Sequence, residues 1–264
     1  MHLAFFYARK RWMKLRPCID LHDGIVKQIV GSTLRDDTPS SVQTNYVAEH
    51  PPAWFASLYK KDELSGGHII KLGPGNDEAA LEALSVWPNG MQIGGGISDE
   101  NASFWLDSGA SHVIVTSYVF QNGIINVDRL KRLVNVVGKK NIVLDLSCRR
   151  KDGDYYIVTD RWQKFTNVKI ERSVIEDLSD YCDEFLIHAA DVEGKCRGIE
   201  KDVVTLLGKL VPIPTTYAGG VRNIADLKLI KELGGGRLDV TVGSALDIFG
   251  GDGLSYRDAV NFCQ

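Results

Sequence analysis

The chain has 264 residues, of which 44% are hydrophobic and 25% charged, and its net charge is -3. This is the composition of a globular protein with a sizeable core, and the balanced charge argues against a general nucleic-acid-binding surface. No apolar run approaches the roughly 18 residues of a membrane-spanning helix, so no membrane partner is expected. The five cysteines form no CxxC pair, and their odd number favours a reducing compartment over a disulfide framework.

The first fifteen residues differ in composition from the rest. In "MHLAFFYARKRWMKLRP" an apolar patch precedes a basic cluster, which is the reverse of the order in a signal peptide. We expect residues 1–15 to be an N-terminal extension of a cytoplasmic protein, with an organellar targeting role left open. No Pro/Gly/Ser-rich linker divides residues 16–264, so these are expected to form a single domain.

Short apolar runs at fairly even spacing predict buried strands. In chain order they are Pro17–Leu21, His68–Leu72, Met91–Ile93, His112–Thr116, Asn141–Leu146, Glu184–His188, Ile213–Tyr217 and Leu238–Val242. Apolar residues at three- and four-residue steps predict helices over 77–87, 127–137 and 224–233, and Asp-Gly in "RRKDGDY" (149–155) predicts a hairpin. Strands alternating with helices over this length predict an α/β fold, a (β/α)8 TIM barrel, which we expect to be a monomer.

A doubly wound open sheet is the alternative fold. Such a sheet usually has a GxGxxG turn after its first strand. Here the first strand is followed by "HDGIVKQIVG", which has no such turn. The barrel is therefore preferred.

The two halves of the chain repeat one pattern. Asp20 corresponds to Asp145, Gly96 to Gly220 and Ser117 to Ser244, at separations of 125, 124 and 127 residues. Three landmarks with nearly the same separation indicate a two-fold repeat of half-barrels, with four βα units in each half.

The repeat predicts two equivalent anion-binding corners at the carboxyl ends of the strands. One corner combines Gly95 and Gly96 with Thr116 and Ser117, and the other combines Gly219 and Gly220 with Gly243 and Ser244. Glycine lets a phosphate approach the backbone closely, and we expect helix N-termini to supply free N–H groups at both corners. Two corners predict a small bis-phosphorylated substrate. The alternative is that the glycines only make tight turns.

The duplicated aspartates end the first and fifth strands, which lie opposite each other in an eight-stranded ring. Asp20 and Asp145 are therefore predicted to face each other between the corners, as a general acid and a general base. His188 ends the sixth strand and is a candidate to orient substrate or carry a proton, or else a structural histidine. Trp162 is a candidate to stack on a planar base. The six histidines are scattered without HxH or HExxH spacing, so no metal site is expected.

Several motifs together resemble the ProFAR isomerase (phosphoribosylformimino-5-aminoimidazole carboxamide ribotide isomerase) family of histidine biosynthesis, in its eukaryotic-type branch. They are "PCIDLHDGIVKQIVGST", "QIGGGI", "SHVIVTS", "IVLDLSCRRKDG", "LIHAADVEG", "TYAGGV" and "DVTVGSALDIFGG". The resemblance implies a duplicated barrel that performs an Amadori rearrangement of an aminoaldose to an aminoketose without a cofactor. It implies that Asp145 is the general acid that opens the ribose ring, and that Asp20 is the general base that removes the C2 proton.

The sequence departs from the common bacterial pattern of that family at several positions. Ser98 replaces an Arg after GGGI, while Arg222 follows AGGV in the second half; Gln28, His188 and Glu193 replace Arg, Thr and Asp. These departures leave the individual phosphate contacts open.

Three alternative functions remain beside the isomerase. The first is the sister cyclase of the same pathway, an imidazole glycerol phosphate synthase barrel, whose family has Lys where this chain has Gln28. The second is a bifunctional isomerase that also serves tryptophan synthesis. The third is a sugar-phosphate-binding barrel without catalytic activity, which the two aspartates argue against.

Overall fold

The computed structural model describes residues 12–30 and 43–264. Eight parallel strands form the wall of a (β/α)8 barrel, as the sequence predicts, and the predicted strands agree with the observed ones to within two residues at each end. They are β1 (Cys18–His22), β4 (Gly67–Lys71), β5 (Met91–Gly94), β6 (Val113–Val115), β9 (Ile142–Asp145), β13 (Glu184–His188), β14 (Thr215–Ala218) and β15 (Leu238–Thr241).

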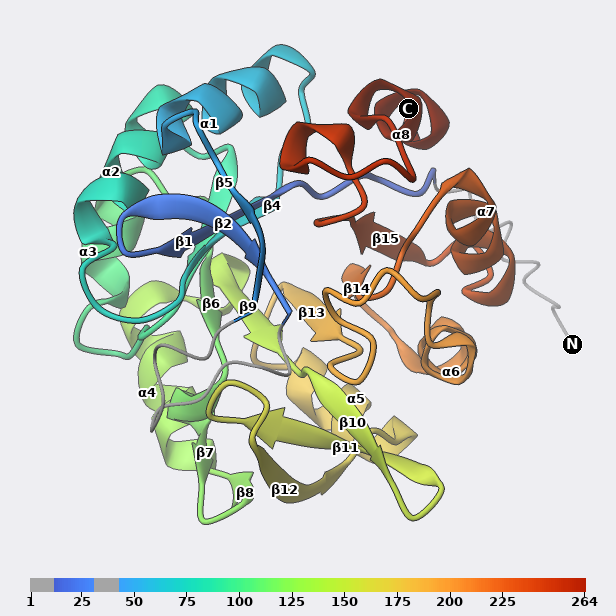
Figure 1. Ribbon diagram of the computed structural model, residues 1–264. Helices are drawn as coiled ribbons and strands as arrows, with labels where there is room; N and C mark the ends of the chain where they lie inside the picture. The colour runs from blue at the N-terminus through green and yellow to red at the C-terminus, as the bar shows by residue number, and fades with distance from the viewer. Residues whose placement is uncertain (1–11, 31–42) are drawn as a thin grey trace, which may run out of the picture.

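The helices surround this ring of strands (Figure 1). They are α1 (Pro52–Lys61), α2 (Asp77–Val86), α3 (Ala102–Asp107), α4 (Val127–Val137), α5 (Arg172–Ser179), α6 (Lys201–Leu210), α7 (Ile224–Leu233) and α8 (Tyr256–Cys263). Helix α4 has the bounds that the sequence predicts, 127–137. It begins there because the side chain of Asn126 caps its first turn, and it ends there because Gly138 follows with a φ of 77°. No helix in the described part of the chain is long and apolar enough to cross a membrane.

The barrel is closed by residues that precede β1. The backbone N–H of Arg16 donates to Val240 O (2.8 Å), and the N–H of Val240 donates to Lys14 O (3.0 Å). Met13 and Leu15 are each only 2% exposed. Residues 13–15, which the sequence assigned to the extension, therefore pack into the barrel; residues 1–11 lie outside the described residues.

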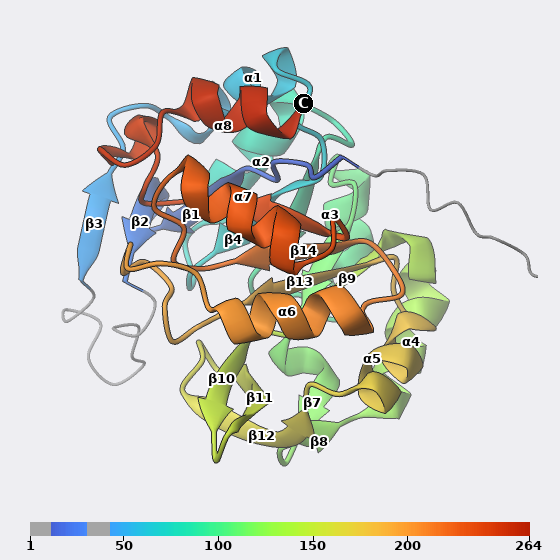
Figure 2. The same ribbon diagram turned by 90° about the vertical axis from the view of Figure 1, so that its right-hand side faces the viewer.

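Each half-barrel carries extra antiparallel strands after its first strand. In the first half, β2 (Ile25–Ile29) and β3 (Thr44–Val47) follow β1, and in the second, β10 (Cys148–Lys151), β11 (Asp154–Thr159) and β12 (Lys164–Lys169) follow β9. The predicted hairpin is confirmed, with positive φ at Asp152 (53°) and Gly153 (89°). Figure 2 shows both excursions from the barrel wall. The remaining short elements are η3 (Ser117–Val119), β7 (Phe120–Gln121), β8 (Ile124–Ile125), η4 (Lys139–Asn141) and η5 (Asp247–Phe249).

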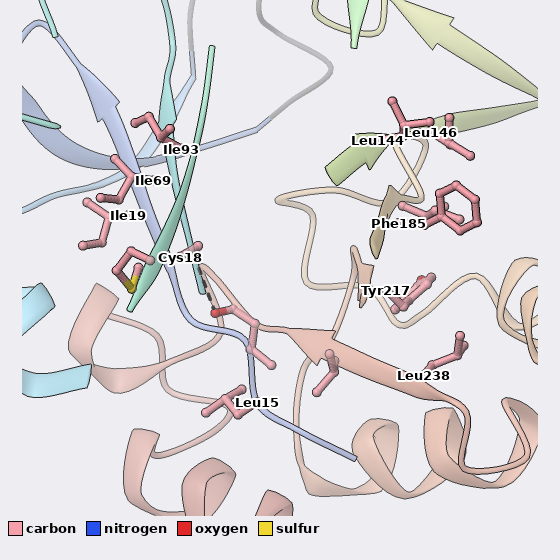
Figure 3. Close-up of a cluster of buried hydrophobic side chains, with 14 of the residues drawn as sticks. Leu15, Cys18, Ile19, Ile69, Ile93, Leu144, Leu146, Phe185, Tyr217 and Leu238 are labelled. Carbon is pink, nitrogen blue, oxygen red and sulfur yellow. Dashed lines mark hydrogen bonds between the residues drawn. The ribbon is translucent and has the colours of Figure 1, made fainter. Parts of the chain in front are cut away.

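The core has two parts. Apolar side chains such as Ile19, Ile69 and Phe185 are fully buried in the large cluster drawn in Figure 3, whereas Ile114, Val143 and Leu186 form a separate small cluster.

The amino ends of the strands are closed by a polar network. Arg16 donates to Asp239 (3.1 Å) and Glu184 (3.3 Å), and Gln92 donates to the other oxygen of Glu184 (2.9 Å). These buried charges are paired, as burial requires. The opposite end of the barrel, where the strands terminate, holds the predicted site residues.

Candidate active site

Two cavities lie at the carboxyl ends of the strands and share the side chains of Asp20, Gln28, His188 and Glu193. The larger has a volume of about 660 Å³, within the usual range for a ligand site. The smaller has a volume of about 30 Å³. The larger is lined by Asp145, Trp162, Gly95, Gly96, Thr116 and Ser117, and the smaller by Gly219, Gly220, Gly243 and Ser244. The structure thus brings every predicted site residue to one of two adjoining cavities.

The side chain of Gln28 holds Asp20 in place, a role that the sequence did not indicate. Asp20 Oδ2 accepts a hydrogen bond from Gln28 Nε2 (3.1 Å), which extends from the neighbouring strand β2. Burial, and then the nearby carboxylate of Glu193, raise the pKa of Asp20 to about 6. A carboxylate with this pKa is largely ionised at neutral pH and is more basic than an exposed aspartate, which suits a general base.

Asp145 has the opposite electrostatic environment. Burial opposes its ionisation, but the positive charge of His188 and the donors of Ser147 outweigh burial and lower its pKa. Ser147 donates to Asp145 Oδ1 through its backbone N–H (2.9 Å) and through its hydroxyl. The Ser147 hydroxyl also lies 3.1 Å from His188 Nδ1, and that nitrogen is 3.8 Å from the carboxylate. A protonated His188 can therefore donate to Ser147 while Ser147 donates to Asp145.

His188 carries the complementary shift. Burial lowers its pKa, but the interaction with Asp145 outweighs burial, so the pKa of His188 lies above its usual value. A general acid must hold a proton when substrate arrives, and the opposite shifts of the two pKa values favour His188 over Asp145 as the holder of that proton. The sequence predicted the two residues but not the serine that connects them.

Two further titratable groups line these cavities: Glu193 lines both, and His68 lines the smaller one. Burial raises the pKa of Glu193, and its Oε2 has no hydrogen-bond partner among the described residues. Burial, and then the charge of His188, lower the pKa of His68 to about 3, so that this imidazole is neutral. From the sequence, Glu193 stood out only as a departure from the bacterial pattern. An acidic residue five positions after a strand-end histidine was the signal that could have identified it.

Trp162 lies over the histidine. The two ring centroids are 5.4 Å apart. Asp160, Arg161 and Trp162 have consecutive φ values of 50°, 55° and 65°, a left-handed run that is costly for residues other than glycine. The run turns the tip between β11 and β12 so that Arg161 and Trp162 line the larger cavity.

The first corner is open and contains a cation. A Cβ added at Gly96, whose φ is 72°, would meet nothing within 4 Å. Lys71, at the end of β4, lines the same cavity; its Nζ contacts Asp77 (2.8 Å) and lies 3.9 Å from the centre of the Trp105 ring. Because Lys71 belongs to a buried strand in the sequence pattern, nothing there indicated its place at an anion corner.

The second corner is nearly filled. A Cβ added at Gly220 would lie 2.2 Å from Gly198 O, and one added at Gly243 would lie 2.3 Å from Gln28 Oε1. Among the described residues, no Lys or Arg lines this cavity. Arg222, which follows the second glycine motif, is instead bound to both carboxylate oxygens of Asp226 (2.8 Å each).

One expectation about the corners is wrong. The sequence predicted helix N-termini at both, but α3 begins only at Ala102 and α7 at Ile224, several residues beyond the glycines. Only the short 3-10 turn η3 starts at a corner residue, Ser117. The helix dipole acts within about one turn. Loop N–H groups and hydroxyls are therefore the donors that these corners can offer to an anion.

One group of potential metal ligands lies elsewhere among the described residues. Ligand atoms of His112, Asp183 and Glu184 lie within 4.8 Å of one another, at the amino ends of β6 and β13. Both Glu184 oxygens are already bound, to Arg16 and Gln92. We assign no function to this group.

Comparison with known proteins identifies related chains. The sequence model of a family described as histidine biosynthesis protein matches residues 14–251. The chain is 55% identical to a Medicago truncatula protein over 94% of this chain and 81% of that protein. It is 51% identical to a Yarrowia lipolytica protein (94% and 97%) and 46% identical to a Saccharomyces cerevisiae protein (91% and 94%).

The chain belongs to this family. The three relatives share one name, 1-(5-phosphoribosyl)-5-((5-phosphoribosylamino)methylideneamino)imidazole-4-carboxamide isomerase, and the Medicago name adds "chloroplastic". This is the ProFAR isomerase branch of the histidine biosynthesis family that the motifs resemble, and the matches do not support the cyclase or the non-catalytic barrel. Members of the family have the barrel fold seen here.

Proposed function

We propose that this chain is an aldose–ketose isomerase that converts ProFAR to PRFAR, the Amadori rearrangement of histidine biosynthesis. One observation carries the proposal: two repeat-related aspartates adjoin the same cavity, between two repeat-related glycine–serine corners. The relatives' name describes a molecule with two 5-phosphoribosyl groups, and a substrate with a phosphate at each end suits two corners.

Ring opening is the first step. The Asp145–Ser147–His188 chain supplies a proton to the ribose ring oxygen, the C1–O bond breaks, and the adjoining nitrogen lone pair forms an iminium. The support is the pKa of His188, which lies above its usual value, and the 3.1 Å contact that links its ring to Ser147. In this proposal Asp145 acts as the acid only by way of the proton that it shares with His188 through Ser147.

Proton removal is the second step. Asp20 takes the C2 proton, the electron pair neutralises the iminium, and the enolamine tautomerises to the ketone. Its pKa of about 6 supports this assignment, because the group is ionised at neutral pH yet basic enough to accept a proton. Gln28, hydrogen-bonded to Oδ2, would hold the carboxylate toward the cavity.

The two ends of the substrate have different environments in this proposal. Gly95, Gly96, Thr116 and Ser117 hold one phosphate near Lys71, while the second corner holds the other with Gly219, Gly220, Gly243 and Ser244. The planar imidazole carboxamide is placed against Trp162, which already lies beside His188. No cofactor or metal takes part in these steps.

A direct assay tests the function. The purified chain, supplied with ProFAR, should produce PRFAR, followed spectrophotometrically without added metal. The same preparation supplied with PRFAR and ammonia should produce no imidazole glycerol phosphate. Turnover of PRFAR and none of ProFAR would instead identify the sister cyclase.

We also propose that the chain acts as a monomer in the cytoplasm. All five cysteines are free thiols, which suits a reducing compartment. Light scattering on the purified chain checks the monomer. A fluorescent fusion checks the location, with accumulation in an organelle as the contradicting result.

A further inference from the structure

The serines of the two corners are each hydrogen-bonded to a hairpin that belongs to the other half-barrel. Ser117 Oγ accepts a hydrogen bond from the backbone N–H of Asp160 (3.1 Å), between β11 and β12 of the second half. Ser244 Oγ accepts one from Asn45 Nδ2 (3.1 Å), on β3 of the first half. The contacts arise because the barrel is a ring: β15 adjoins β1, and β6 adjoins β9.

These contacts leave each hydroxyl hydrogen available. A serine hydroxyl has one hydrogen to donate and lone pairs that accept. In both serines the structure shows the oxygen accepting, and within residues 12–30 and 43–264 it shows neither hydroxyl donating. Each serine lines a cavity. With an N–H directed at the oxygen from the hairpin side, the hydroxyl hydrogen is free to point toward an anion.

Asn45 makes more contacts at its corner than the backbone N–H of Asp160 makes at the other. Its amide group has two hydrogens, and its Nδ2 also donates to Gly194 O (2.9 Å), which follows the shared residue Glu193. Asn45 thus joins three segments, β3, the loop after β13 and the loop after β15. The lining of the second corner that lies within residues 12–30 and 43–264 offers an anion neutral donors, Ser244 among them.

We propose that Asn45 is a positioning residue for the second phosphate: it holds Ser244 so that the hydroxyl hydrogen is directed at the anion. The inference rests on the proposed bis-phosphorylated substrate. The first half-barrel thereby contributes to phosphate binding in the second half. In the same way, the N–H of Asp160 in the second half orients Ser117 in the first. Asn45 acts through Ser244 and is not a catalytic residue.

Two substitutions separate orientation from simple contact. Asn45→Ala removes the donor, and KM for ProFAR should rise about fivefold with kcat within about twofold, because phosphate binding acts equally in ground and transition states. Asn45→Asp keeps the shape but only accepts, so it would take the hydroxyl hydrogen of Ser244 and add a negative charge. KM should then rise well beyond the Ala value. Asn45→Asp with a KM at or below that of Asn45→Ala overturns the proposal.

A pair of double variants provides the matched control. If Asn45 acts through Ser244, Asn45→Ala should add nothing to the KM of Ser244→Ala. Combined with Ser117→Ala at the other corner, Asn45→Ala should multiply KM as it does in the wild type. Independent multiplication in the Ser244→Ala background, or no effect of Asn45→Ala in the wild type, overturns the proposal. Asn45 is exposed, so all variants are expected to fold, and matching circular dichroism spectra check this.

Inorganic phosphate distinguishes this inference from the proposed function. Wild-type turnover of ProFAR alone decides the function. Titration of the full chain with inorganic phosphate, followed calorimetrically, should show weaker binding in Asn45→Ala than in wild type and no difference between Ser244→Ala and the Asn45→Ala/Ser244→Ala double variant. If the wild-type chain turns over ProFAR but Asn45→Ala binds inorganic phosphate as tightly as wild type, the proposed function stands and the proposed role of Asn45 is overturned.

Discussion

The two glycine–serine corners share a backbone conformation but not their surroundings. Gly96 and Gly220 both have a φ of 72°, yet an added Cβ is unobstructed at Gly96 and lies 2.2 Å from Gly198 O at Gly220. The first corner opens into a cavity of about 660 Å³ that Lys71 lines, and the second into one of about 30 Å³ whose described lining residues include no Lys or Arg. Duplication has preserved the local chain path, while the loop after β13 has filled the space in one half only.

The two aspartates differ in the same way. Asp20 and Asp145 lie on equivalent strands, although only Asp145 ends its strand and Asp20 lies two residues before the end of β1. Burial and a neighbouring carboxylate raise the pKa of Asp20, whereas His188 and Ser147 lower that of Asp145. For two carboxyl groups alone this order is the reverse of the proposed roles, because the acid of a pair should have the higher pKa. In the proposed mechanism the proton for ring opening therefore comes from His188 through Ser147. The first prediction tests whether this difference in environment is a difference in role.

Replacing either aspartate should cause the largest loss. Asp20→Asn and Asp145→Asn should each lower kcat by at least about 10²-fold, the usual scale for general acid–base groups. Asp183→Asn, at the amino end of β13 on the opposite face, should leave kcat unchanged. Steady-state kinetics on the three variants provides the comparison, and a loss of less than about threefold would remove that aspartate from the mechanism.

Alanine at the two equivalent glycines should have different consequences. Gly96→Ala should mainly raise KM, because its methyl group projects into the open corner, with a stability cost of about 1–2 kcal/mol for the left-handed φ. Gly220→Ala should carry the same φ cost and also displace Gly198, so it should have the lower melting temperature of the two. Equal melting temperatures for the two variants would show that the corners are equivalent after all.

Removing the carboxylate of Glu193 should shift a pH profile. Because Asp20 must be ionised to act as a base, kcat/KM should fall as the pH drops below about 6. Glu193 helps to raise that pKa, so Glu193→Gln should move the acid limb to lower pH. Glu176→Gln, on the exposed part of α5, should leave the limb in place. An unmoved or upward-moved limb in Glu193→Gln contradicts the electrostatic account of the shared cavity.

The sequence was most informative where local patterns decide structure. Helix α4 follows from its spacing of apolar residues and from Gly138, and β9 follows from its apolar run, which placed Asp145 correctly at a strand end. The repeat then brought both aspartates and both glycine corners to one face. These properties depend on neighbours along the chain and on the symmetry of the barrel.

Contacts between distant residues could not be predicted in this way. The approach of Asn45 to Ser244, of Gly198 to Gly220 and of Ser147 to His188 depends on how loops of different length fold over the strand ends. The prediction of helix N-termini at the corners was wrong for the same reason. The loops after the glycines continue for several residues before α3 and α7 begin. Loop length and packing, more than residue type, distinguish the two corners.

The central claim is that two repeat-related corners hold the two phosphates of one substrate, with Asp20 and Asp145 between them. A crystal structure of the chain with PRFAR bound tests it most directly. The account predicts one phosphate at Gly96 and Ser117, the other at Gly220 and Ser244 with the loop after β13 displaced, and both carboxyl groups facing the opened sugar. A single occupied corner, or either carboxyl group directed away from the ligand, would contradict it.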